Sequence, residues 1–256
     1  MPFSIALAGK GGTGKTTLAG MLVKYLIKNK KTPILAVDAD SNANFNDVLG
    51  VEVHGTLGNA REEMKKGEVP SGMTKDVFIS MKMSQAVVES TDFDLVVMGR
   101  PEGAGCYCAA NTLLTGFLEK LTKNYPYMVM DNEAGMEHVS RLTTRNVDVL
   151  LLVSDTSTRG VTAAIRIFEL ANSLNIGVGK SFLILNRTKN KPVDSIYQMA
   201  EKANIQIAGT LPADETVYDY DMEGKATINL PEDNPFVASA FQAFDQIFSS
   251  DLSLRF

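Results

Sequence analysis

The sequence predicts a doubly wound α/β domain, in which helices cover both faces of a mostly parallel sheet. Short apolar runs of strand length recur along the chain, and segments with apolar residues at helical spacing lie between them. The runs are apolar at nearly every position, which is typical of strands buried on both faces of a parallel sheet. The expected strands are residues 3–8, 34–37, 93–98, 127–131, 149–153 and 182–185.

Length and composition predict one soluble domain spanning residues 1–256. The chain has 45% hydrophobic and 21% charged residues, which is ordinary for a globular protein. A net charge of -5, with no long basic run beyond residues 28–31, argues against nucleic-acid binding. No apolar stretch is long enough to span a membrane, and the apolar C-terminal segment is not a basic anchor, since its charges are Asp245, Asp251 and a single Arg255. We therefore expect a cytoplasmic protein without a nucleic-acid or membrane partner.

A glycine-rich loop, residues 9–17, follows the first expected strand and precedes an amphipathic helix. Its glycines allow successive backbone N–H groups to point inward at the positive end of that helix, where a phosphate binds. The alternative is a flexible glycine turn with a surface lysine, but the spacing matches the G-x-x-x-x-G-K-[ST] pattern. Lys15 is placed to neutralise the β- and γ-phosphates, and the Thr16 hydroxyl to bind Mg²⁺. The predicted nucleotide-binding residues of this loop are Gly11, Gly12, Thr13, Gly14, Lys15, Thr16 and Thr17.

Carboxylates follow two of the expected strands. Asp38 and Asp40 end the strand at 34–37, and Asp131 ends the strand at 127–131. Because ligands bind beyond the carboxyl ends of strands in open α/β sheets, these acids are expected near the phosphates. Asp38 or Asp40 is alternatively a turn or helix cap, whereas Asp131 occupies the position of a Walker B aspartate.

Cys106 and Cys108 are the only cysteines and lie in a glycine-rich loop before an expected helix. A helix N-terminus favours the thiolate that binds metal. One subunit supplies only two sulfur ligands, but a two-fold dimer supplies four, enough for Zn²⁺, Ni²⁺ or an iron-sulfur cluster. The alternative is a pair of small buried residues without a ligand.

Lys10 is a second lysine inside the loop, so that the stretch resembles the deviant Walker A family, Lys-Gly-Gly-x-Gly-Lys-Thr-Thr. This family includes MinD, ParA and the nitrogenase iron protein. The resemblance implies an ATPase that dimerises around ATP and Mg²⁺, with Lys10 reaching the phosphates of the partner subunit. It further implies that Asp38 and Asp131 hold Mg²⁺ directly or through water, and that Asp40 orients the attacking water. Lys10, Lys15 and Asp40 are thus the expected catalytic residues.

The same resemblance predicts where the adenine base binds. Asn186 and Arg187 follow the strand at 182–185, where the family has its base-binding asparagine. Pro212 lies in residues 205–214, which resemble the family's last strand and base-covering turn. The alternative at both places is an ordinary boundary between a strand and a loop.

Within the family, residues 99–108 and 131–138 are similar to the CooC-type accessory ATPases of nickel carbon monoxide dehydrogenase. This similarity implies an ATP-hydrolysing metallochaperone that dimerises with nucleotide and with Ni²⁺ or Zn²⁺ held by Cys106 and Cys108. Its client is then carbon monoxide dehydrogenase, acetyl-CoA synthase or a related nickel enzyme. Two alternatives stay open: a positioning ATPase of the MinD or ParA kind, and an ATP-driven iron-sulfur electron donor resembling the nitrogenase iron protein.

Overall fold

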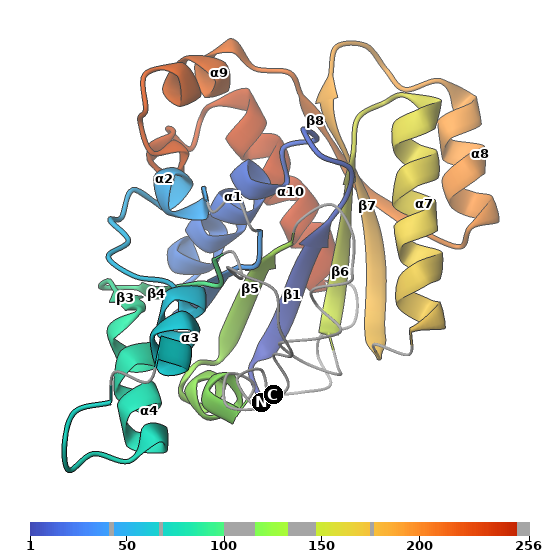
Figure 1. Cartoon of the computed structure of the whole chain (residues 1–256). Helices are drawn as coiled ribbons and strands as arrows, with labels where there is room; N and C mark the ends of the chain where they lie inside the picture. Colours follow the sequence, from blue (N-terminus) through green and yellow to red (C-terminus); the bar gives the residue numbers. More distant parts are fainter. Residues whose placement is uncertain (41–43, 67–68, 100–115, 133–146, 175–176, 250–256) are drawn as a thin grey trace.

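The computed structural model describes residues 1–40, 44–66, 69–99, 116–132, 147–174 and 177–249. Their strands form one eight-stranded sheet in the order β3-β4-β2-β5-β1-β6-β7-β8 (Figure 1). The strands are β1 (Phe3–Ala8), β2 (Ile34–Asp38), β3 (Val87–Glu89), β4 (Phe93–Val97), β5 (Tyr127–Asp131), β6 (Val147–Ser154), β7 (Val178–Thr188) and β8 (Gln206–Pro212).

Strand β1 lies inside the sheet, paired in parallel with β5 on one side and β6 on the other. All paired strands run parallel except the short edge strand β3, which is antiparallel to β4. After β1 the chain crosses to β2, on the β5 side, and later returns to β6 on the opposite side. The carboxyl end of β1 is therefore at a switch in strand order, where α/β sheets bind ligands.

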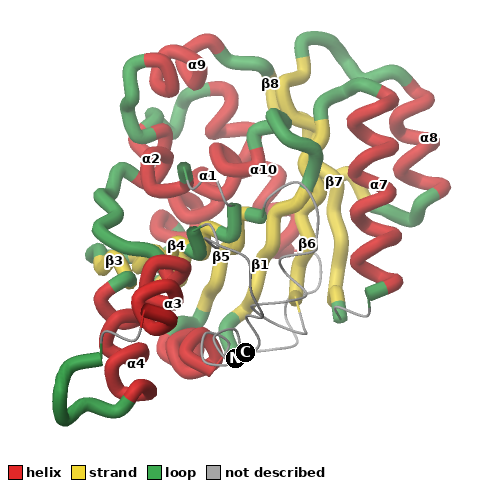
Figure 2. Tube along the Cα trace, in the orientation of Figure 1, coloured by secondary structure: helices red, strands yellow, loops and turns green. Residues whose placement is uncertain are grey.

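The helices form two sets, one on each face of the sheet, and a hydrophobic layer lies between the sheet and each set. Alternate strand residues face opposite layers: Ile5 and Leu7 pack with α1 and α10, whereas Ala6 and Ala8 pack with α3, α4, α7 and α8. Figure 2 shows α7 beside β7 with α8 next to α7, and α1 and α10 on the other side of the strands. The helices are α1 (Lys15–Lys28), α2 (Phe45–Leu49), α3 (Leu57–Lys66), α4 (Lys75–Gln85), α7 (Thr158–Ser173), α8 (Asp194–Lys202), α9 (Glu215–Met222) and α10 (Pro235–Ser249), with the 3-10 turns η1 (Thr122–Asn124) and η2 (Thr227–Asn229).

The doubly wound fold expected from the sequence is confirmed, and each expected strand is present within a few residues of its expected bounds. The structure adds the edge strand β3 and the short helix α2, which have too few residues to show a period. Ser157 caps α7 by accepting a hydrogen bond from the Gly160 amide at 3.0 Å. Among the described residues, no helix is both long and apolar enough to cross a membrane.

Candidate nucleotide-binding site

The phosphate-binding loop (residues 9–17) joins β1 to α1 at the switch in strand order. Gly14 precedes the first residue of α1 and has a φ of 86°, a conformation that favours glycine. None of the described side chains caps this end of α1, and its first turn carries no acidic residue. The free N–H groups and the helix dipole therefore leave the end of α1 ready for an anion.

The loop folds back on itself through the carbonyl oxygen of Lys10. The Thr13 hydroxyl donates to this oxygen at 2.8 Å, and the Lys15 ammonium lies 3.5 Å from it. Lys15 is buried, whereas Lys10 is exposed. The hydrogen bond of the buried Lys15 ammonium to the Lys10 carbonyl is long and goes to a neutral oxygen, so this cation is placed to pair with a phosphate group.

Asn186, near the end of β7, holds the phosphate-binding loop through a side-chain hydrogen bond. Its amide nitrogen donates to the Thr13 carbonyl at 2.8 Å, and its side-chain oxygen accepts from the Arg187 amide at 2.8 Å. A Cβ added to Gly14 would lie 2.5 Å from that amide nitrogen, so only glycine fits between the helix and Asn186. Contact of Asn186 with adenine stays a prediction, because both polar ends of its side chain are engaged within the protein.

Asp38 and Asp131 lie opposite each other in the register of β2 and β5, and Asp131 is also paired with Leu7 of β1. Burial raises the pKa of Asp38 to about 6, against hydrogen bonds from the backbone N–H groups of Phe45 and Asp40. Burial likewise raises the pKa of Asp131 to about 7, opposed by Thr16 and Lys15 and reinforced by Asp38. The ends of β2 and β5 thus place two of the predicted acids, Asp38 and Asp131, near the loop.

Both carboxylate oxygens of Asp131 are buried and, among the described residues, neither has a hydrogen bond within the usual distance and angle limits, although Thr16 is near enough to lower the pKa of Asp131. Buried charged groups normally have a partner or bind a metal. Oxygen ligands beside a phosphate site are those that Mg²⁺ prefers. The donor set of Thr16, Asp38 and Asp131 therefore fits a magnesium ion that accompanies a nucleotide.

A pocket of about 950 Å³ opens in front of the loop. One side is formed by the loop and the start of α1, a second by α2 and the residues after it, and a third by Arg187 and residues 221–227. Its lining residues are Gly11, Gly12, Gly14, Lys15, Thr16, Thr17, Asp40, Asn44, Asn46, Asp47, Val48, Gly50, Val51, Glu52, Arg187, Asp221, Gly224, Lys225, Ala226 and Thr227. This volume is in the range of small-molecule and cofactor sites.

Several predicted site residues are absent from this lining. Lys10 is on the outside of the loop, Asp38 and Asp131 are buried behind it, and Pro212 ends β8. The lining residues of α2 and of 221–227 were not predicted, because neither segment carries a motif and both reach the site only through folding. Among the described residues, no group of three or more His, Cys, Asp or Glu side chains could hold a metal ion. Cys106 and Cys108 lie outside the described residues.

A glycine-rich loop between β1 and α1, with a buried lysine and with acids at the neighbouring strand ends, defines a P-loop nucleotide-binding protein. The family model for the CobQ/CobB/MinD/ParA nucleotide binding domain matches residues 4–228. The chain therefore belongs to this family, and it is an ATPase that uses ATP with Mg²⁺.

Comparisons with individual proteins agree with this family. An uncharacterized ATP-binding protein of Methanocaldococcus jannaschii is 43% identical over 90% of this chain and 92% of its own length. The carbon monoxide dehydrogenase accessory protein CooC of Rhodospirillum rubrum is 29% identical over 88% of this chain and 89% of its own. The structure of MinD from Pyrococcus horikoshii complexed with Mg-ADP has a TM-score of 0.70 at 18% identity, covering 97% of each chain, which supports the fold.

Proposed function

We propose that the protein is an ATP-hydrolysing metallochaperone that dimerises with nucleotide and metal and assists nickel insertion into a nickel enzyme. The observation that carries the ATP-dependent part is the buried Lys15 beside a loop with free helix N–H groups. It is supported by Asp131, whose buried carboxylate oxygens have no hydrogen bond of standard geometry among the described residues. The metal-dependent part is supported by the Cys-x-Cys pair at 106 and 108 and by the similarity to CooC. Carbon monoxide dehydrogenase or acetyl-CoA synthase is the proposed client.

The phosphate chemistry proceeds through positioning and neutralisation of charge. The N–H groups of the loop and the Lys15 ammonium bind the phosphates, and Thr16, Asp38 and Asp131 hold Mg²⁺ directly or through water. When bound, Mg²⁺ neutralises charge on the phosphate oxygens. Asp40 lines the pocket and orients the attacking water. Lys10, exposed on the outer side of the loop, reaches the phosphates of the partner subunit.

Equilibrium dialysis with Ni²⁺ tests the metal site. We expect the wild type to take up one Ni²⁺ per dimer, and the Cys106→Ser, Cys108→Ser double variant to lose that uptake while still hydrolysing ATP. Equal uptake by both proteins refutes the metal assignment. A brown protein after anaerobic purification, with absorbance in the visible range, indicates an iron-sulfur cluster instead.

The solved structures of MinD have the same fold as this chain, and the fold fits a positioning ATPase as well as a metallochaperone. A positioning ATPase is therefore the second candidate. Co-sedimentation with anionic lipid vesicles and gel retardation of DNA, each with ATP and with ADP, distinguish the two. ATP-dependent retention by either, combined with no uptake of Ni²⁺, supports the second candidate. The net charge of -5 and the lack of a basic tail among the described residues favour the metallochaperone.

A further inference from the structure

One wall of the nucleotide pocket is a short segment that connects α9 to η2. This 224–227 wall consists of Gly224, Lys225, Ala226 and Thr227, all of which line the pocket. Backbone hydrogen bonds fix its two ends. The Lys225 N–H donates to the Tyr220 carbonyl at 2.8 Å, and the Leu230 N–H donates to the Thr227 carbonyl at 3.0 Å. Thr227 is buried, and among the described residues its hydroxyl oxygen has no hydrogen-bond partner.

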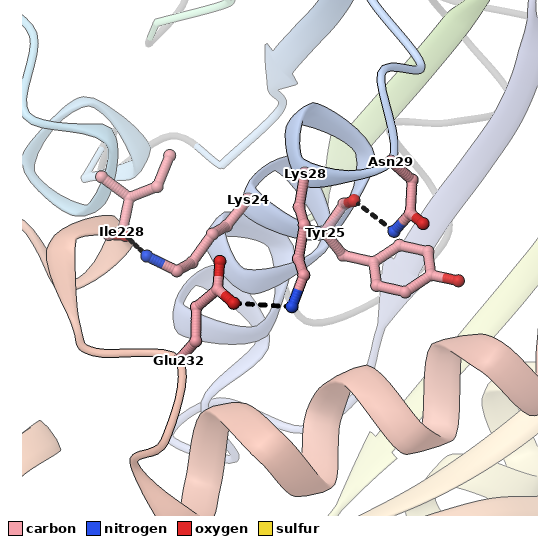
Figure 3. Close-up of polar contacts among 6 residues, drawn as sticks. All are labelled: Lys24, Tyr25, Lys28, Asn29, Ile228 and Glu232. Atoms are coloured by element: carbon pink, nitrogen blue, oxygen red, sulfur yellow. Dashed lines mark hydrogen bonds and ion pairs between the residues drawn. The ribbon is translucent and has the colours of Figure 1, made fainter.

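Lys24 of α1 holds this wall from behind. Its ammonium donates to the carbonyl oxygen of Ile228, the residue after the wall, at 2.7 Å (Figure 3). The bond joins a helix whose first turn lines the pocket to a segment 204 residues later in the chain. Lys24 is partly buried, and burial lowers the pKa of its ammonium against the opposing effect of Glu232. The cost of this burial is offset by the charged hydrogen bond.

The neighbouring lysine offers a comparison on the same helix. Lys28 lies one turn further on and pairs with Glu232 at 2.6 Å, also drawn in Figure 3. Both side chains of this pair are about half exposed, 48% and 50%. Exposed ion pairs contribute little to stability, and Glu232 is outside the pocket lining. Of the two lysines, Lys24 is therefore the one that fixes the pocket.

Helix α2 fixes the same wall from another side. Gly50, at the end of α2, has a φ of 71°, and a Cβ built on it would lie 2.8 Å from the Ala226 Cβ. Within α1, a Cβ on Gly20 would lie 2.3 Å from a methyl group of Val48 in α2. Helices α1 and α2 and the 224–227 wall thus pack against one another beside the pocket. Among these contacts, the Lys24 hydrogen bond is the one made by a polar side chain.

We propose that Lys24 is a positioning residue for nucleotide binding, which holds the 224–227 wall at a fixed distance from the start of α1. The inference rests on the proposed placement of the nucleotide in this pocket. Leu230 is fully buried and keeps η2 attached to the core without Lys24. Loss of the bond therefore loosens the wall without unfolding the protein, and it lowers the affinity for the nucleotide rather than the rate of hydrolysis.

Binding of Mg²⁺·ADP to the full chain, measured by isothermal titration calorimetry, tests the proposal. Lys24→Met keeps the alkyl chain and removes the ammonium, and it should weaken binding about five- to tenfold, part of what a charged hydrogen bond contributes. Lys28→Met is the matched control and should bind within about twofold of the wild type, as befits an exposed ion pair. Lys24→Arg keeps a charged donor and should restore most of the affinity.

Two further readouts separate positioning from a general loss of stability. In Lys24→Met, the KM for ATP should rise while kcat stays unchanged. Hydrogen exchange should accelerate at the amides of Asn229 and Leu230, which donate to Ala226 and Thr227, but not at those of α10. Unchanged affinity in Lys24→Met, or equal losses in Lys24→Met and Lys28→Met, overturns the inference. If Lys15→Ala binds Mg²⁺·ADP like the wild type, the proposed nucleotide site itself is wrong and the inference falls with it.

Discussion

Replacing Asp131 with asparagine is expected to stabilise the nucleotide-free protein at alkaline pH. Burial raises the pKa of Asp131 from 3.8 to about 7. Between these two values the unfolded chain releases the proton while the folded protein keeps it. The contribution of Asp131 to stability is therefore fully present below pH 3.8 and is lost as the pH rises through about 7. Asparagine is nearly isosteric and does not ionise.

The magnitude follows from the two pKa values. Linkage with 3.8 and about 7 gives a loss of about 3 kcal/mol for the wild type between pH 5 and pH 8.5, as an upper limit. Because water that reaches a buried carboxylate partly relieves the cost of its charge, a measured change of about 1–3 kcal/mol is expected. The difference in unfolding free energy between Asp131→Asn and the wild type is compared at the two pH values. The cost of burying an amide in place of a neutral acid is the same at both and therefore cancels.

Urea unfolding of the wild type and Asp131→Asn at pH 5 and pH 8.5, without Mg²⁺ or nucleotide, measures this change. The exposed Asp233→Asn is the matched control and should follow the wild type at both pH values. With saturating Mg²⁺·ADP the order should reverse, because the wild type gains more from ligand linkage than the variant. A difference between Asp131→Asn and wild type that is the same at both pH values refutes the reasoning.

Three other predictions follow from the loop and the pocket. Gly14→Ala places a Cβ 2.5 Å from the Asn186 amide nitrogen at a φ of 86°, so calorimetry should show loss of Mg²⁺·ADP binding in a protein that keeps its circular dichroism. Gly50→Ala should lower the free energy of unfolding by about 1–2 kcal/mol for the positive φ alone, plus the clash with Ala226. Adding Ala226→Gly in a double-mutant cycle should recover the part due to the clash; strict additivity of the two changes contradicts that contact. Lys10→Ala should keep Mg²⁺·ADP binding but stay monomeric with ATP in light scattering, whereas an ATP-dependent dimer in this variant excludes the proposed contact.

The sheet was predictable because its signal is local. The apolar runs that became β1, β2, β5 and β6 are buried along nearly their whole length, and each is bounded by turn residues in the sequence. The phosphate-binding loop is local in the same sense, since its glycines, Lys15 and Thr16 are contiguous. Asp38 and Asp131 were predictable one step further away, because parallel strands bring their carboxyl ends to one edge.

The rest of the pocket required the folded structure. The 224–227 wall has an ordinary loop composition, and it meets α1 only because η2 packs against that helix. Lys24 resembles any lysine of an amphipathic helix, which the sequence alone assigns to solvent. Asn186 is a further case: the family resemblance predicts a contact with adenine, which stays a prediction, and the structure adds a hydrogen bond from its amide to the Thr13 carbonyl that the sequence did not indicate. A polar residue at a strand end can serve the loop as well as the ligand.

Helix α1 determines which kinetic parameter each substitution changes. Lys15 and Lys24 are nine residues apart in one helix, a spacing of about 14 Å along its axis at 1.5 Å per residue. A helix is stiff over this length. While the Lys24 hydrogen bond is intact, the 224–227 wall therefore cannot move independently of the start of α1, where the phosphates bind. The residues proposed for chemistry, Lys10, Lys15 and Asp40, are all at the phosphate end. Loss of the Lys24 bond leaves that end unchanged and releases only the far wall, and for this reason affinity should fall without a change in kcat.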